Sequence, residues 1–134
     1  MRNCVLVVAL LALSGCASYQ HDPWTRQDTV LQYMVTAAYV IDGVQTSQIQ
    51  YHPELEEGQP LATWALGRQP STSDTWQYFA TLSISSYLIS YYLPARWRPY
   101  WQGAQLAIEA KSILSNCAHG LGSICKEDHD HEEI

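Results

Sequence analysis

The order of apolar and polar positions along the chain predicts an all-α fold. In the first long segment, apolar residues recur three and four positions apart, as on one side of a helix: Val30, Leu31, Met34, Val35, Ala38, Ile41 and Val44. Polar loops rich in proline and glycine separate the later segments. The sequence therefore predicts a small bundle of three main helices and one short helical turn, at residues 25–50, 74–93, 95–117 and 61–66.

Residue types at the ends of these segments support the predicted bounds. Thr25 can cap the first helix, with Asp28 three residues further on, as in a capping box. Gly67 can end the short turn in the left-handed conformation. Pro94 stops the second long helix, whereas Pro99 is tolerated in the opening turn of the third. Each helix thus has a local start or stop signal.

The first fifteen residues are typical of a secretory signal, which we expect to be helical. Arg2 supplies a basic start, and an apolar run over 4–13 follows, too short to span a bilayer. The next four residues, Leu13-Ser14-Gly15-Cys16, resemble the lipobox of bacterial lipoproteins, in which the cysteine thiol takes a diacylglycerol. The alternatives are an ordinary secretory signal with a chance cysteine, or an uncleaved anchor.

The lipobox resemblance implies a location and an organisation. Acyl chains on Cys16 would hold the mature protein to a membrane, because each buried methylene contributes about 0.8 kcal/mol. Ala17, rather than Asp, follows the cysteine, which resembles an outer-membrane rather than an inner-membrane sorting signal. We expect a periplasm-facing protein with a signal peptide, a lipidated tether, a helical domain and an acidic disordered tail at 1–15, 16–24, 25–125 and 126–134.

Charge is sparse in this chain, and its balance is acidic. Seven Lys and Arg residues stand against 13 Asp and Glu, a net charge of −6, and no basic stripe suits a nucleic acid. No charged residue lies between Thr75 and Ala95, a stretch long enough to span a membrane. Its serines and threonines also suit close helix packing. A bundle on or partly in the membrane and a soluble periplasmic bundle both stay open.

Two cysteines are left for pairing once Cys4 leaves with the signal and Cys16 is acylated. Cys117 and Cys125 lie eight positions apart, and in an oxidising compartment they predict a disulfide. Free thiols are the main alternative. A metal or redox role is disfavoured, because the pair lacks Cys-x-x-Cys spacing.

Polar residues on two of the predicted helices form a first candidate site. Asp42, Gln45 and Thr46 share one side of the first helix, and Glu109 and Asn116, seven apart, share one side of the third. If these sides meet, two carboxylates, an amide and a hydroxyl could bind a cation or perform general acid–base chemistry. The sequence favours the alternatives, which are two exposed carboxylates or interhelical hydrogen bonds that fix the register.

Arginines and aromatic residues form a second candidate site at the start of the third helix: Arg96, Trp97, Arg98, Tyr100 and Trp101. Such residues suit a membrane interface. They suit a protein-binding patch equally well, because Trp, Tyr and Arg are enriched there. The alternative is ordinary packing at a helix start.

Several short motifs along the mature chain carry a resemblance to a group of proteins. The motifs are Asp42-Gly43-Val44-Gln45-Thr46, Glu57-Gly58-Gln59-Pro60-Leu61, Gly67-Arg68-Gln69-Pro70-Ser71 and Leu93-Pro94-Ala95-Arg96-Trp97-Arg98, followed by Trp101-Gln102, Glu109 and Asn116. Together they resemble a group of small bacterial and phage-borne membrane-associated helical proteins. In that group a Glu-Asn-Pro motif occupies the loop, where this chain has Glu57-Gly58-Gln59-Pro60. The resemblance implies membrane association and no particular activity.

These patterns predict an envelope lipoprotein with a structural or protein-interaction role and no catalytic activity. Its expected partners are membrane lipid, through acylated Cys16, and an envelope protein or membrane surface, with no nucleic acid. No cofactor or metal site is expected, because the motifs of phosphate loops, zinc proteases and zinc fingers are absent. The alternative is a membrane-apposed enzyme or cation-binding protein that uses Asp42 and Glu109.

Overall fold

The computed structural model describes residues 22–122 and 125, and these residues form helices without a strand. The elements are α2 at Arg26–Thr46, a 3-10 turn η1 at Ile49–Tyr51, α3 at Pro60–Leu66, α4 at Thr72–Tyr92 and α5 at Arg98–Ala118. The all-α prediction is confirmed. The predicted signal peptide, the lipidation site Cys16 and the acidic tail lie outside the described residues.

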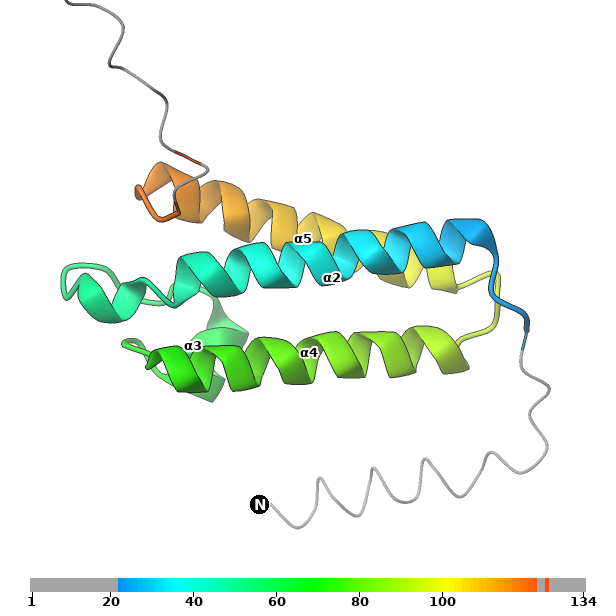
Figure 1. Ribbon diagram of the computed structural model, residues 1–134, viewed down its shortest axis with the longest axis horizontal. Helices are drawn as coiled ribbons and strands as arrows, with labels where there is room; N and C mark the ends of the chain where they lie inside the picture. Colours follow the sequence, from blue (N-terminus) through cyan, green and yellow to red (C-terminus); the bar gives the residue numbers. More distant parts are fainter. Residues whose placement is uncertain (1–21, 123–124, 126–134) are drawn as a thin grey trace, which may run out of the picture.

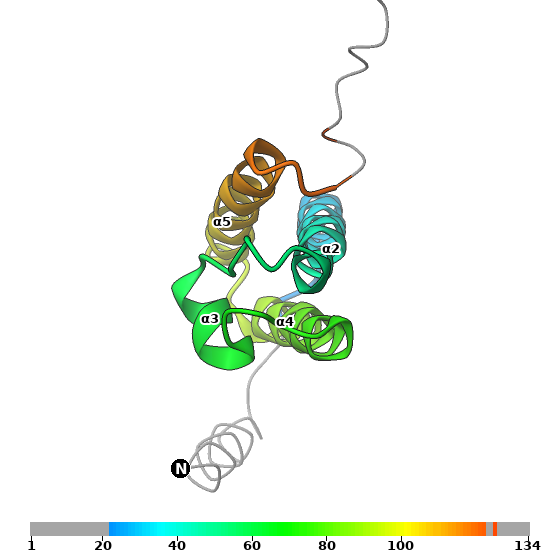
Figure 2. The same cartoon turned by 90° about the vertical axis from the view of Figure 1, so that its left-hand side faces the viewer.

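Helices α2, α4 and α5 lie alongside one another as a three-helix bundle (Figures 1 and 2). Helix α2 packs most extensively against α5 and also contacts α4, while the short α3 packs on α4. The start of α2 and the α4–α5 connection lie at one end of the bundle, and η1 and the end of α5 lie at the other (Figure 1).

Local side-chain contacts set the starts of two helices. The Thr25 hydroxyl accepts a hydrogen bond from the Asp28 amide at 3.1 Å, and the Asp28 carboxylate accepts one from the Thr25 amide at 2.9 Å. This is the predicted capping box, which supplies partners for amides that the helix itself leaves unpaired. Ser71 caps α4 in the same manner by accepting from the Asp74 amide at 3.2 Å.

The first long helix is shorter than predicted, because it ends at Thr46 rather than near Gln50. The Ser47 hydroxyl donates to the carbonyl of Val44 at 2.8 Å, and the chain then tightens into η1. In this conformation the Gln50 side chain accepts a hydrogen bond from the Thr72 amide at 3.0 Å, at the start of α4. A long-range contact, which sequence spacing does not encode, thus stabilises the chain beyond the end of α2.

The interior of the bundle is largely polar, and its buried apolar cluster is small: Val35, Tyr39 and Phe79. The buried side of α5 consists only of polar and charged residues, three and four positions apart: Arg98, Gln102, Gln105, Glu109 and Ser112. The apolar residues of α2 mostly lie outside, with Val30, Met34, Ile41 and Val44 exposed. The described part of the bundle therefore buries more polar than apolar residues, whereas apolar side chains usually fill the interior.

Hydrogen bonds between side chains connect the three long helices through this polar interior. Gln102 of α5 donates to the carbonyl of Asp28 at 3.1 Å and to the side chain of Gln32 at 3.2 Å. Gln32 of α2 in turn donates to the Ser86 hydroxyl of α4 at 3.3 Å. Because buried polar groups are costly without partners, such contacts fix which sides of the helices face one another.

No helix in the described part of the chain combines the length and the apolar character that crossing a bilayer requires.

Candidate functional site

Asp42 and Glu109, the two predicted carboxylates, meet inside the bundle. Asp42 lies near the end of α2 and is 1% exposed, and Glu109 lies on α5 and is 5% exposed. A side-chain hydrogen bond joins them. The alternative of two solvent-exposed carboxylates is therefore wrong, since the two helices bury both groups at their contact.

Three amide and hydroxyl groups surround the Asp42 carboxylate. Asn116 of α5 donates to Oδ1 at 2.7 Å, and Thr46, one turn along α2, donates to the same oxygen at 3.4 Å. Gln59 donates to Oδ2 at 3.3 Å, and its amide nitrogen also donates to the Ser112 hydroxyl. The site thus combines α2, α5 and the loop before α3.

Burial raises the pKa of both carboxyls. The pKa of Glu109 rises to about 8, first through desolvation and then through the negative charge and hydrogen bond of Asp42 and the charge of Glu57. The pKa of Asp42 rises to about 6 through desolvation and Glu57, although hydrogen bonds from Glu109, Thr46 and Asn116 oppose the rise. At neutral pH Glu109 therefore keeps its proton and donates it to the Asp42 carboxylate.

Two tyrosines lie within electrostatic reach of this pair. Burial raises the pKa of Tyr39 and of Tyr78 to about 12, and the charge of Glu109 adds to the shift in both cases. The Tyr39 hydroxyl donates to the side chain of Gln105 at 2.8 Å. Both hydroxyls therefore keep their protons at any physiological pH.

A cavity of about 630 Å³ opens beside the carboxylate pair. The loop before α3 and the second half of α5 form most of its wall, with Ile49 and Leu121 at one side. Gln59 and Asn116, which both donate to Asp42, line this cavity together with Ser112. One layer of amide and hydroxyl side chains thus separates Asp42 from the cavity.

Sequence reasoning placed four members of this site, Asp42, Thr46, Glu109 and Asn116, and missed two others. Ser112 lies between Glu109 and Asn116 at helical spacing, so the polar series along α5 could have identified it. Gln59 lies in a loop, and only its position in the Glu57-Gly58-Gln59-Pro60 motif pointed to it. Its contact with Asp42 depends on the path of that loop.

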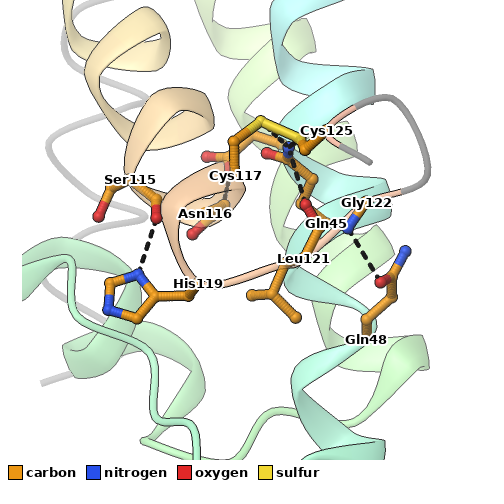
Figure 3. Close-up of a disulfide and its surroundings, with 10 residues drawn as sticks. Gln45, Gln48, Ser115, Asn116, Cys117, His119, Leu121, Gly122 and Cys125 are labelled. Carbon is orange, nitrogen blue, oxygen red and sulfur yellow. Dashed lines mark hydrogen bonds between the residues drawn. A yellow bond between two sulfur atoms is a disulfide. The ribbon is translucent and has the colours of Figure 1, made fainter. Parts of the chain in front are cut away.

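Gln45, also predicted for this site, contacts the disulfide instead (Figure 3). The predicted Cys117–Cys125 bond is present, with the two Cα atoms 5.1 Å apart. The Gln45 side-chain nitrogen donates to the carbonyl of Leu121 at 3.3 Å and lies 3.4 Å and 3.3 Å from the two sulfurs. The Gly122 amide donates to the Gln48 side chain at 3.1 Å (Figure 3). These contacts hold the disulfide loop against the end of α2.

Removal of the disulfide is expected to lower the stability of the bundle. The double variant Cys117→Ser, Cys125→Ser should lose about 2–3 kcal/mol, because the bond no longer restricts the unfolded chain. Urea unfolding of the two proteins measures this difference. Wild-type protein under reducing conditions should unfold like the variant, and equal midpoints for oxidised and reduced wild type would contradict the prediction.

The predicted arginine–aromatic group lies at the opposite end of the bundle, and only some of its members are exposed. Trp97 and Tyr100 are 52% and 73% exposed, and the exposed Arg96 lies 5.7 Å from the Trp97 ring centre. Trp101 is half-buried. Arg98 is fully buried, so it does not belong to the surface predicted for it.

Buried Arg98 connects the start of α5 to the chain before α2. Its guanidinium donates to the carbonyls of Leu93, Pro23 and Asp22 at 3.0, 3.1 and 2.7 Å. Its Nη1 atom also lies 3.5 Å from the Asp28 carboxylate. The sequence could not show this, because the partners are up to 76 positions away.

Among the described residues, no group of three or more His, Cys, Asp and Glu side chains could hold a metal ion. Comparisons of the chain with protein-family models, with curated proteins and with solved structures found no match.

Proposed function

We propose that the protein is a lipid-anchored envelope protein whose helical domain lies against the membrane and acts there by contact. The observation that carries this proposal is the near absence of charge on the outside of the bundle. On α2, α4 and α5, the only exposed charged side chains are Arg26, Asp74 and Lys111. A protein surrounded by water on all sides normally carries many more.

Large apolar and aromatic side chains occupy this uncharged surface. We call it the apolar flank, and its exposed members on the three long helices include Val30, Met34, Val40, Ile41, Val44, Ile84, Leu88, Ile89, Ile108 and Leu114. Large exposed apolar side chains in this number are typical of contact with lipid or with another protein. In this protein the apolar flank supports contact with lipid, because the short tether expected after Cys16 would keep the bundle close to the membrane.

The expected lipid anchor, Cys16, is separated by few residues from the end of the bundle where the described chain begins. Cys16 precedes Asp22, the first described residue, by six positions, which can span at most about 20 Å. An acylated Cys16 would therefore hold Asp22, four residues before the start of α2, within about 20 Å of the membrane surface. The α4–α5 connection lies at the same end of the bundle (Figure 1).

Aromatic side chains gather at this end, which we call the aromatic end: Trp24, Tyr87, Tyr91, Tyr92, Trp97 and Tyr100. Trp24 stacks on Tyr87 with ring centres 5.7 Å apart. Trp97 and Tyr100 lie 6.0 Å apart and are both exposed. Trp and Tyr prefer the boundary between lipid headgroups and acyl chains, and Arg96 beside Trp97 can pair with phosphate groups.

The experiment uses the full lipoprotein in phospholipid vesicles that carry brominated acyl chains, which quench tryptophan emission at short range. We expect quenching in the wild type, and Trp97→Phe should lower the quenched share of the emission. Trp64, exposed on α3 near the other end of the bundle, provides the matched control: Trp64→Phe should raise that share.

The intact mass of the extracted protein checks the anchor in the same preparation. It should correspond to loss of residues 1–15 and gain of acyl chains, and treatment with globomycin should prevent the cleavage. An uncleaved, unacylated mass would contradict the anchor. An equal effect of the two tryptophan substitutions would contradict the membrane contact of the aromatic end.

A further inference from the structure

We propose that the cavity beside Asp42 and Glu109 binds a small organic cation with a protonated amine, whose N–H groups donate to these carboxyls. The proposal concerns the end of the bundle remote from the aromatic end, and it does not depend on membrane contact. It rests on the charge of the site, an acceptor without a partner, and the position of one amide nitrogen.

Among the described residues, no lysine or arginine forms an ion pair with Asp42 or Glu109. Asp42, Glu57 and Glu109 act on one another electrostatically, and no lysine or arginine contributes to the pKa of Asp42 or Glu109. Arg68 pairs with Glu56 instead, at 2.7 Å. Lys111 lines the cavity but is itself exposed. A cationic ligand would supply the missing charge.

Glu109 offers an acceptor that the protein does not use. Its Oε2 atom is buried and has no hydrogen-bond partner, and the whole residue is only 5% exposed. Glu109 shares one side of α5 with Ser112 and Asn116, which both line the cavity. Because buried acceptors are rarely left unpaired, an N–H donor that arrives from the cavity would complete this group.

The Gln59 side chain shows that a nitrogen donor fits at this place. Its Nε2 atom donates to Asp42 Oδ2 at 3.3 Å and also to the Ser112 hydroxyl. Gln59 belongs to a loop and follows Gly58, around which there is open space. A ligand amine that displaces this side chain would take the position of its nitrogen.

The size and lining of the cavity limit the rest of the ligand. A volume of about 630 Å³ falls among those of small-molecule sites, about 300–1,000 Å³. Ile49, Ile108 and Leu121 contribute apolar wall next to the polar layer. A short apolar body behind the amine fits this lining. Metal ions, the other class of cation, are an outcome that the test distinguishes.

The test is isothermal titration calorimetry of the full-length protein in lipid nanodiscs, with empty nanodiscs as the blank. The probes are n-butylammonium, uncharged n-butanol of similar shape, and the chlorides of Na⁺, Mg²⁺ and Ca²⁺. We expect n-butylammonium to bind at least tenfold more tightly than n-butanol. At pH 7 its binding should also release a proton from the carboxylate pair, seen as different heats in phosphate and Tris buffers.

Variants connect the binding to this site. Asp42→Asn should weaken n-butylammonium binding at least tenfold, whereas Asp74→Asn, an exposed acidic residue of α4, should leave it unchanged. Gln59→Ala should strengthen binding several-fold, because it removes the resident amide from Asp42. This loop variant decides the question even if Asp42→Asn fails to fold. Absence of binding, equal binding of n-butanol, binding of metal ions only, or an unchanged affinity in Gln59→Ala would overturn the proposal.

Discussion

Arg98→Ala is expected to destabilise the protein by about 3–5 kcal/mol, the largest effect of any single substitution considered. The Arg98 guanidinium is fully buried and donates to three backbone carbonyls, those of Leu93, Pro23 and Asp22. It is also the cation next to the buried Asp28 carboxylate, at 3.5 Å. Removal would leave these acceptors without a donor and Asp28 without a counter-charge, at the point where α5 meets the start of α2.

Urea unfolding followed by circular dichroism measures this loss of stability, and two other variants serve as controls. Arg98→Lys keeps the charge but not the forked geometry, so it should recover only part of the stability. Arg96→Ala, two positions away at an exposed site, should change the stability by no more than about 0.5 kcal/mol. Similar losses for Arg98→Ala and Arg96→Ala would show that the buried contacts contribute little.

The stability of the protein is expected to fall as the pH rises from about 5 to about 8. Folding raises the pKa of Glu109 from 4.5 to about 8 and that of Asp42 from 3.8 to about 6. Between these limits the folded state binds more protons than the unfolded state, so each rise in pH favours unfolding. The stabilisation from these bound protons is complete below the pKa values of the unfolded state. It is lost as the pH rises past the pKa values of the folded state, about 6 for Asp42 and about 8 for Glu109.

Glu109→Gln tests the origin of this dependence. The glutamine amide can donate to Asp42 as the protonated Glu109 does, and it does not titrate. We expect the variant to unfold at a temperature about 4–8 °C higher than the wild type at pH 8, which corresponds to about 1 kcal/mol. Its melting temperature should also vary less between pH 5 and pH 8.

Glu54→Gln is the matched control for this measurement. Glu54 is exposed, and its pKa is lowered by a backbone hydrogen bond and by His52, so it does not titrate in this pH window. Its substitution should leave the slope of the wild type unchanged. A wild-type stability that is flat from pH 5 to pH 8, or a Glu109→Gln variant that is less stable at pH 8, would contradict the assignment of the shared proton.

The sequence alone determined the helices, most of their ends, and the disulfide. These features depend on residues within about four positions of one another or on residue counts. Thr25 and Asp28 form the predicted capping box, Pro94 follows the end of α4, and Cys117 pairs with Cys125. Four of the six residues of the candidate site also follow from helical spacing, because positions three, four and seven apart share one side of a helix whatever that side meets.

Only the tertiary structure decided which sides of the helices face inward. On α2, the apolar series and the polar series both repeat every three to four residues, so spacing cannot tell which is buried. The outcome depends on partners far along the chain: Arg98 with the carbonyls before α2, Gln102 with Gln32, and the loop residue Gln59 with Asp42. Because each of these polar groups loses its water on burial and finds its partner in another element, only the assembled bundle fixes a polar interior and an apolar exterior.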